Sequence, residues 1–202
     1  MRFPVRLGAA EETLIAQLKA VGADQVAERI SAVGLPTRRV EAYHYTDLKS
    51  LLQTIPPLAQ PANEASAPAL RVPGAYNLMI ANGVVQNAAA APAGVIVGKT
   101  EGGVLTTRDD MLVNLSNAFA KEVLTLTLES SVDPVIQIER RTEGEAAHVS
   151  DAVKIFVADG ASAVILETFS GSDAAHVANH ASYISLGKDA ELTHITIDLS
   201  AR

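Results

Sequence analysis

The chain has 202 residues, of which 48% are hydrophobic and 4% aromatic, and it contains neither Cys nor Trp. This length suits one large or two small domains, with a core built from Ala, Val, Ile and Leu. The net charge of −7 argues against a nucleic-acid-binding protein, and the lack of Cys excludes disulfides, thiolate catalysis and Cys-ligated metal within the chain. No apolar run suits a membrane span or a secretory signal, so we expect a cytoplasmic protein without membrane contact.

The N-terminal region predicts two short helices over residues 10–33. Apolar residues recur at helical spacing on both sides of Gly22, namely Leu14, Leu18 and Val21, then Val26, Ile30 and Val33. Acidic residues lie in the first turn of the first helix, and Asp24 is placed to cap the second. Helices this short are marginal alone, so we expect them to pack on each other or on a later element.

Residues 34–52 form the most distinctive stretch of the chain. A glycine and a proline end the preceding helix, and two arginines and a glutamate follow. Tyr43 and Tyr45 flank His44, and three leucines at helical spacing complete the stretch. The segment either docks on a partner or is an ordinary connection between helices. Its aromatic residues either form a binding patch or pack on the leucines.

The next segments predict a boundary between helical and β-rich parts. Prolines among Ala, Ser and Asn mark residues 53–73 as an extended, mobile linker. Residues 76–85 predict a hairpin, because Asn82-Gly83 suits a type I′ turn in which both central residues have positive φ. A short strand is expected over 94–97. A helix is expected over 109–122, with two aspartates in its first turn.

From residue 123 onward the chain predicts short strands, over 123–128, 135–138, 153–157, 163–166, 183–186 and 192–197. The turn after Val157 resembles the turn after Leu186 at an offset of about 29 residues, with an alanine at each tight corner. This echo is typical of a solenoid, although two unrelated turns in a sandwich would also produce it. Residues 192 and 194 are out of phase with Ile195 and Ile197, which indicates a bulge or a strand buried on both faces.

Two patterns approach known ligand motifs. Residues 94–100 are similar to a phosphate-binding loop, but Ala93 stands where that motif needs Gly and no helix follows, so we expect no such site. His176 and His180 have the spacing of two helical metal ligands, and His148 or His194 could complete a set in space. The missing Glu and the strand-like surroundings favour structural or exposed histidines.

Glu167 and Asp173 could pair for acid–base catalysis, although an acid at a strand end is more often a turn or edge feature. The sequence has no evident catalytic triad or dinucleotide fingerprint. We therefore assign no catalytic, cofactor-binding or metal residue and expect no enzymatic activity. The roles of His44, His176 and His180 stay open.

Residues 35–48 carry a long resemblance to a known family. The run Leu-Pro-Thr-Arg-Arg-Val-Glu-Ala-Tyr-His-Tyr-Thr-Asp-Leu resembles the N-terminal signature of the SufB/SufD family of iron–sulfur cluster assembly proteins, and SufD in particular, with Tyr43 where that family usually has Trp. The order of later features is also similar, from the Asn82-Gly83 hairpin through the 115–119 segment and Glu167 to the region 179–187.

The resemblance implies an α+β fold in which a small N-terminal helical domain precedes the first part of a right-handed parallel β-helix (β-solenoid). We expect a helical segment over 1–55, a Pro/Ala-rich linker over 56–73, a β-hairpin plus helix that complete the N-terminal region over 74–121, and the start of the β-helix over 122–202. The chain would then be a truncated family member, or one that pairs its open edge with another copy.

The resemblance also implies a non-catalytic scaffold subunit of the SUF (SufBCD) assembly complex. Its expected partners are a SufB-like paralogue and a SufC-like ATPase, with a homodimer through the β-helix edge as a further option. The full complex would handle iron–sulfur clusters and reduced flavin, and no cofactor is expected in this chain. The alternative is a free-standing β-solenoid enzyme or binding module of carbohydrate-active or acyl-transfer type, but the hexapeptide repeat or aligned acids that it needs are not found.

Overall fold

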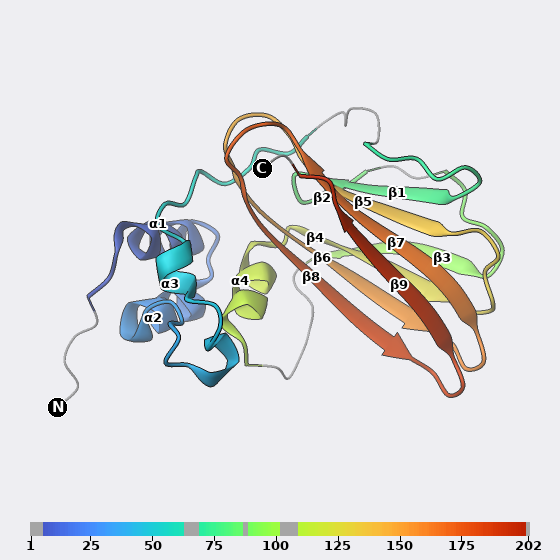
Figure 1. Cartoon of the computed structure of the whole chain (residues 1–202), viewed down its shortest axis with the longest axis horizontal. Coiled ribbons are helices and arrows are strands. Elements are labelled where there is room, and N and C mark those ends of the chain that lie inside the picture. Colours follow the sequence, from blue (N-terminus) through green and yellow to red (C-terminus); the bar gives the residue numbers. More distant parts are fainter. Residues whose placement is uncertain (1–5, 63–68, 87–88, 102–108, 201–202) are drawn as a thin grey trace.

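Helices and strands occupy separate parts of the molecule (Figure 1). The computed structural model describes residues 6–62, 69–86, 89–101 and 109–200. The helices are α1 (Ala9–Ala20), α2 (Asp24–Val33), α3 (Leu48–Leu51) and α4 (Met111–Phe119), with a short 3-10 helix, η1 (Glu41–Tyr43). In the described part of the chain, no helix is long and apolar enough to cross a bilayer.

The strands form two mixed sheets. They are β1 (Tyr76–Ala81), β2 (Val84–Val85), β3 (Val95–Glu101), β4 (Glu122–Leu128), β5 (Ile136–Thr142), β6 (His148–Val157), β7 (Ser162–Gly171), β8 (Val177–Leu186) and β9 (Glu191–Asp198). One sheet has the order β2-β1-β5-β7-β9 and the other β3-β4-β6-β8. The expected α+β class is confirmed. The sheets are not closed, and the β-helix stays a prediction.

From β4 onward the chain alternates between the two sheets. From β6 onward each strand pairs in parallel with the strand two places earlier, so Val123 lies opposite Ala152 and Ala152 opposite Ala181, a constant step of 29 residues. The other sheet has the same step, from Ile136 to Ile165 to His194. Because the steps match, equivalent residues stack and their side chains share one interior between the sheets.

The interior is built from branched aliphatic side chains. Leu124, Leu126 and Ile155 from one sheet and Ile138 and Ile165 from the other are all fully buried in one cluster. The two similar turns after Val157 and Leu186 are neighbours in the structure, because residues 158–160 lie against residues 187–188. A Cβ on Gly187 would come within 2.6 Å of the Asp159 backbone nitrogen, so only glycine allows this close approach.

Three expectations about the strands need correction. Most strands run longer than predicted, because polar residues such as Arg140 continue the alternation inward. β9 has an unbroken register with β7, so it contains no bulge, and Ile195 is 45% exposed, so the strand is not buried on both faces. The range 74–121, expected to complete the N-terminal region, instead supplies β1, β2 and β3 to the sheets and α4 to the helical part.

The Asn82-Gly83 hairpin is confirmed, with φ of 48° and 78° at its two central residues. The preceding linker is bonded to the sheets wherever it is described. Leu58 forms a parallel bridge with His148, and the Gln137 side chain pairs with the backbone at Leu70 and Val72. The remaining part, 63–68, lies outside the described residues.

The helical part has its own core, in which the 34–52 stretch takes a central place. Leu35, Tyr43 and Leu48 are buried among α1, α2 and α4. The buried Glu11 of α1 accepts a hydrogen bond from the Leu35 backbone and pairs with Lys49 at 2.8 Å. Burial alone would raise the pKa of Glu11, but the Lys49 ammonium and two backbone N–H groups lower it overall.

The helices join the strands through α4 and α1. Ser116 of α4 donates to the backbone oxygen of Asp151 in β6, and Asn179 of β8 donates to the backbone of α4. Gln17 of α1 bonds to His148, whose ring meets Phe119 edge-on. The two parts therefore share a polar and aromatic seam.

α4 begins at Met111, two residues later than expected, so neither aspartate lies in its first turn. Asp110 is its N-cap, accepting from the N–H groups of Leu112 and Val113, and it also accepts from the Tyr43 hydroxyl at 3.0 Å. Asp109 lies outside the helix and pairs with Arg29 at the surface. The sequence correctly placed acids here but did not separate their roles.

We expect Asp110→Ala to lower the free energy of unfolding by about 1–2 kcal/mol, because it removes a helix cap and the acceptor of the Tyr43 hydroxyl hydrogen bond. The adjacent Asp109→Ala is the matched control and should cost under about 1 kcal/mol, since it removes only exposed contacts, the ion pair with Arg29 and a hydrogen bond from Asn114. Urea unfolding of both variants measures the difference. Equal losses would contradict the capping role.

His148 predicts a specific acid sensitivity. Burial lowers its pKa from 6.5 to about 4. Between these values the unfolded chain binds a proton that the folded chain does not, so the free energy of unfolding falls as pH drops, by roughly 2–3 kcal/mol at pH 4.5. Between pH 7 and pH 4.5, the free energy of unfolding of His148→Gln should therefore fall by roughly 2–3 kcal/mol less than that of the wild type. Identical acid losses in urea titrations would contradict the assignment.

Candidate functional site

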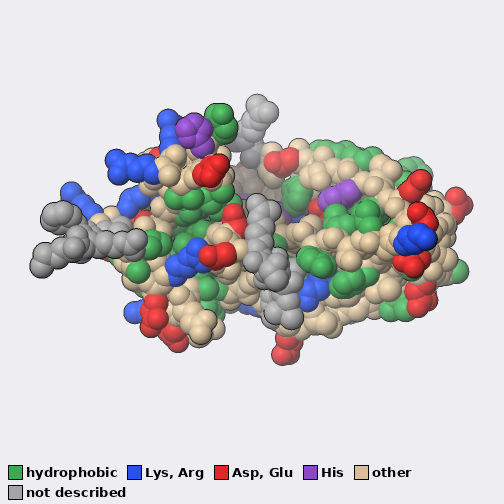
Figure 2. Space-filling model, turned by 90° about the horizontal axis from the view of Figure 1, so that it is seen from below, with side chains coloured by type: hydrophobic (Ala, Val, Ile, Leu, Met, Phe, Trp, Pro, Cys, Tyr) green, Lys and Arg blue, Asp and Glu red, His purple; other side chains and the backbone are tan. Residues whose placement is uncertain are grey.

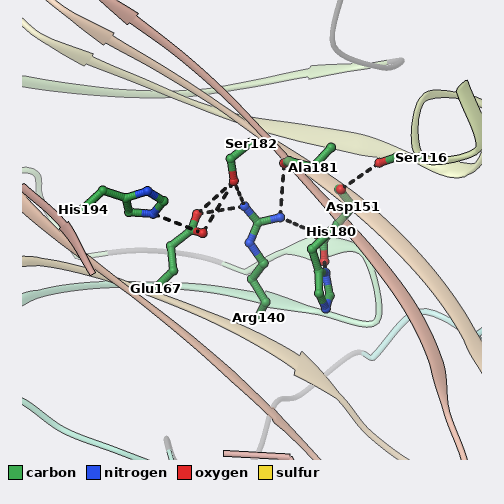
Figure 3. Close-up of polar contacts among 8 residues, drawn as sticks. All are labelled: Ser116, Arg140, Asp151, Glu167, His180, Ala181, Ser182 and His194. Atoms are coloured by element: carbon green, nitrogen blue, oxygen red, sulfur yellow. Dashed lines mark hydrogen bonds and ion pairs between the residues drawn. The ribbon is translucent and has the colours of Figure 1, made fainter. Parts of the chain in front are cut away.

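A polar cluster lies between the two sheets (Figure 3), next to the aliphatic core. Its six members come from five consecutive strands. They are Arg140 of β5, Asp151 of β6, Glu167 of β7, His180 and Ser182 of β8, and His194 of β9. We call this set the Arg140 cluster.

Strand alternation puts these side chains in the interior. Arg140 follows Ile136 and Ile138 on the inward face of β5, and both of those residues are fully buried. Asp151 precedes the buried Val153 by two residues on β6. The parallel register then sets His180 directly opposite Asp151. The cluster thus gathers inward-facing side chains from successive strands, although Arg140, Glu167 and His194 occupy different register positions of their sheet.

The guanidinium of Arg140 is the centre of the cluster. One of its nitrogens, Nη1, is 2.5 Å from Asp151 Oδ1, and the other, Nη2, is 2.8 Å from Glu167 Oε1. It also donates to Ser182 Oγ at 2.6 Å and to the Ala181 carbonyl at 3.3 Å. Arg140 is 1% exposed, and these bonds replace the hydration of Nη1 and Nη2, whereas the buried Nε has no hydrogen-bond partner among the described residues.

The two histidines form the outer part of the cluster. His180 Nδ1 is 2.9 Å from the second oxygen of Asp151, and its ring stacks on Phe169. His194 Nε2 is 3.3 Å from Glu167 Oε2. Their side chains are 16% and 25% exposed, whereas the carboxylates are 1% and 3% exposed. Each carboxylate therefore bridges a buried arginine and a solvent-accessible histidine.

The electrostatics favour the ionised form of Asp151. Burial alone would raise the pKa of Asp151, but His180 and Arg140 beside it bring the pKa below its ordinary value. For Arg140, burial opposes the charged form, yet Asp151 and Glu167 raise its pKa overall.

The arrangement does not suit nucleophilic catalysis. Ser182 Oγ interacts with Arg140 and Glu167, and no histidine is placed to take its proton. Across the described ranges, no group of three or more His, Asp or Glu side chains could hold a metal ion. The cluster supplies fixed charge and hydrogen-bonding groups to the accessible end of the interior.

His176 and His180 do not converge on one site. The ring nitrogen Nδ1 of His176 accepts from the Ala147 N–H, and Nε2 is 2.8 Å from Ser172 Oγ. Because Nδ1 is an acceptor, Nε2 carries the proton and cannot act as a base toward Ser172, whose hydroxyl donates to Gly144. Burial lowers the pKa of His176.

The remaining candidates also separate. Glu167 is buried in the Arg140 cluster, whereas Asp173 is exposed in the turn before β8, so the two acids do not act together. Residues 95–101 are a strand paired with β4, which agrees with the expectation of no phosphate loop. In the aromatic stretch Tyr43 packs inward, while Tyr45 is 95% exposed beside His44.

The sequence reading missed Arg140, Asp151 and Ser182. Residue 140 was excluded because the predicted strand stopped at 138, where charged residues begin. The available signal was the 29-residue echo itself, since that offset aligns Asp151 with His180 and Arg140 with Phe169. The echo signals only the Asp151–His180 pair, because the same register sets Glu167 opposite Ile138 and His194 opposite Ile165.

We expect Arg140→Met to lower the free energy of unfolding by about 3–5 kcal/mol, because it leaves two buried carboxylates without their cation. Arg29→Met removes an exposed pair with Asp109 and is the control, at about 1 kcal/mol or less. Urea unfolding at neutral pH compares them. Losses that agree within error would mean that Arg140 does not compensate the buried acids.

Comparisons of the chain with protein families and with curated sequences found no relative. No protein-family model matches the chain, and no curated protein sequence matches it.

Proposed function

We propose that this chain is a SufD-like, non-catalytic scaffold subunit of the SUF iron–sulfur cluster assembly complex. Two features support the proposal. One is the signature-like run over residues 35–48, and the other is the alternation between two sheets with a 29-residue step, which suits the start of a right-handed β-helix. A scaffold acts through surfaces, so the proposal depends on an interaction surface.

The open end of the sheets is that surface, and it is the observation that carries the proposal. β8 and β9 are edge strands in the described residues. Ile184 and Leu186 of β8 stand opposite the buried Ile155 and Val157, yet they are 36% and 51% exposed. Inward-facing side chains are thus only partly covered, beside backbone groups that can accept another strand.

The surface favours a partner of similar architecture. A further pair of strands would extend both sheets and cover the exposed residues of β8, while the His180 and His194 rings would meet polar groups of the partner. Figure 2 also shows hydrophobic side chains at the surface of the strand-rich half. A SufB-like paralogue has this chemistry, and a second copy of this chain is the other candidate.

The clusters handled by such a complex would be cargo, and this chain would contribute shape and charge. Its sequence has no Cys, and we assign no cluster ligand to it. The SufC-like ATPase and the reduced flavin belong to the proposed complex as a whole. The proposed role of this chain does not need the Arg140 cluster to catalyse a reaction.

The test is co-purification of the tagged chain with a SufB-like paralogue and a SufC-like ATPase expressed together. Leu186→Lys should weaken capture of the paralogue by about tenfold or more, because it places a charge among the exposed inward-facing residues of the joining edge.

The matched control is Ile96→Lys. Ile96 is 51% exposed, as Leu186 is, and it lies on β3, the opposite edge strand of the same sheet. This variant should keep wild-type capture. If the wild-type chain retains neither partner, the scaffold proposal is overturned. If both variants lose capture of the paralogue equally, the assignment of the β8 edge is overturned.

A further inference from the structure

A cavity lies where the end of α4 meets β6, on the outer face of the sheet and away from the Arg140 cluster. Its volume is about 230 Å³, and Leu58, Phe119, Lys121, His148 and Ser150 are among its lining residues. This is room for several water molecules or one small organic molecule. Most of the lining is apolar, and no Asp or Glu side chain takes part in it.

Ser150 is one of the lining residues, and its hydroxyl is an unused polar group with less than 1 Å² of accessible surface, so it reaches a ligand in the cavity only after its side chain rotates. The residue is 5% exposed, and its Oγ has no hydrogen-bond partner in the described part of the chain. Alternation along β6 puts Ser150 on the same face as His148, toward α4. An unpaired buried hydroxyl costs stability, so its presence beside a cavity indicates a binding group.

His148 supplies a second unused group. Gln17 uses its amide nitrogen to bond Pro56, so its oxygen faces His148 Nδ1 at 2.8 Å and must accept the proton there. The other ring nitrogen, Nε2, is then a bare acceptor, and no partner for it exists among the described residues. The ring is held rigidly by this bond and by its edge contact with Phe119.

The surroundings favour a neutral ligand. The backbone at the C-terminal end of α4 carries partial negative charge that opposes an anion, and Lys121 at the same place opposes a cation. His148 is uncharged at neutral pH, because burial lowers its pKa to about 4. The polar wall therefore recognises hydrogen-bond geometry, and the apolar wall recognises shape.

We propose that this cavity binds a small neutral molecule with an apolar body and a hydroxyl or amide group. That group donates to His148 Nε2 and exchanges a hydrogen bond with Ser150 Oγ, while the apolar body packs on Phe119 and Leu58. The site is independent of the scaffold proposal, because it shares no residue with the β8 and β9 edge.

Benzyl alcohol and toluene are a suitable pair of probes, since they differ by the hydroxymethyl group that the site would recognise. Amide chemical shifts of the full chain, followed by NMR during titration, report binding. Benzyl alcohol should shift Phe119, His148 and Ser150 saturably in the millimolar range, and toluene should bind at least threefold more weakly.

Ser150→Ala separates binding from folding. It should weaken benzyl alcohol roughly three- to tenfold while leaving stability unchanged or higher, because it deletes an unpaired hydroxyl. Thr168→Val is the matched control. Thr168 is 0% exposed and its hydroxyl is also unpaired among described residues, but it is not part of the cavity lining, so probe affinity should not change.

Two results would overturn the proposal. Shifts that never saturate at these residues would mean that the cavity holds water only. Equal affinities for toluene and benzyl alcohol, with no effect of Ser150→Ala, would mean that it is an apolar void without a polar recognition group.

Discussion

The 29-residue parallel register is the constraint on which this structure depends. Because both sheets advance by the same step, every interior residue has an equivalent in the next strand of its sheet, and the core forms layer by layer. The turns must stack with the same step, which is why Gly187 approaches the Asp159 backbone so closely. A one-residue slip would turn the aliphatic core outward and the polar face inward.

The same register makes a charged layer tolerable. Arg140 would be costly alone in an aliphatic interior, but the neighbouring strands bring Asp151 and Glu167 to its two nitrogens. These acids then meet His180 and His194 toward the accessible end. The outer histidines of the cluster thus place polar groups beside the exposed apolar side chains of Ile184 and Leu186. Specific protein interfaces have a similar mixture of polar and apolar groups.

The helical part is joined to the strands through α1 and α4 rather than through the linker alone. Glu11 fixes the 34–52 stretch on α1, and Asp110 joins Tyr43 to the start of α4. At the other end of α4, Phe119 and His148 meet above β6 and leave the cavity that contains Ser150. Stability and the proposed ligand site thus share one seam, but the binding hydroxyl itself takes no part in holding it together.

Local signals in the sequence determined the helix-to-strand order, the Asn82-Gly83 turn and the 29-residue echo, because caps, turn φ values and apolar periodicity act over a few residues. They did not determine how far each strand runs or which face of β9 is covered. Arg140 looked like the end of a strand, and Ile195 looked buried, because the sequence contains no record of which neighbour lies opposite. Only the tertiary register decided that Arg140 meets two acids and that Ile195 faces outward, since parallel pairing joins residues far apart in the chain.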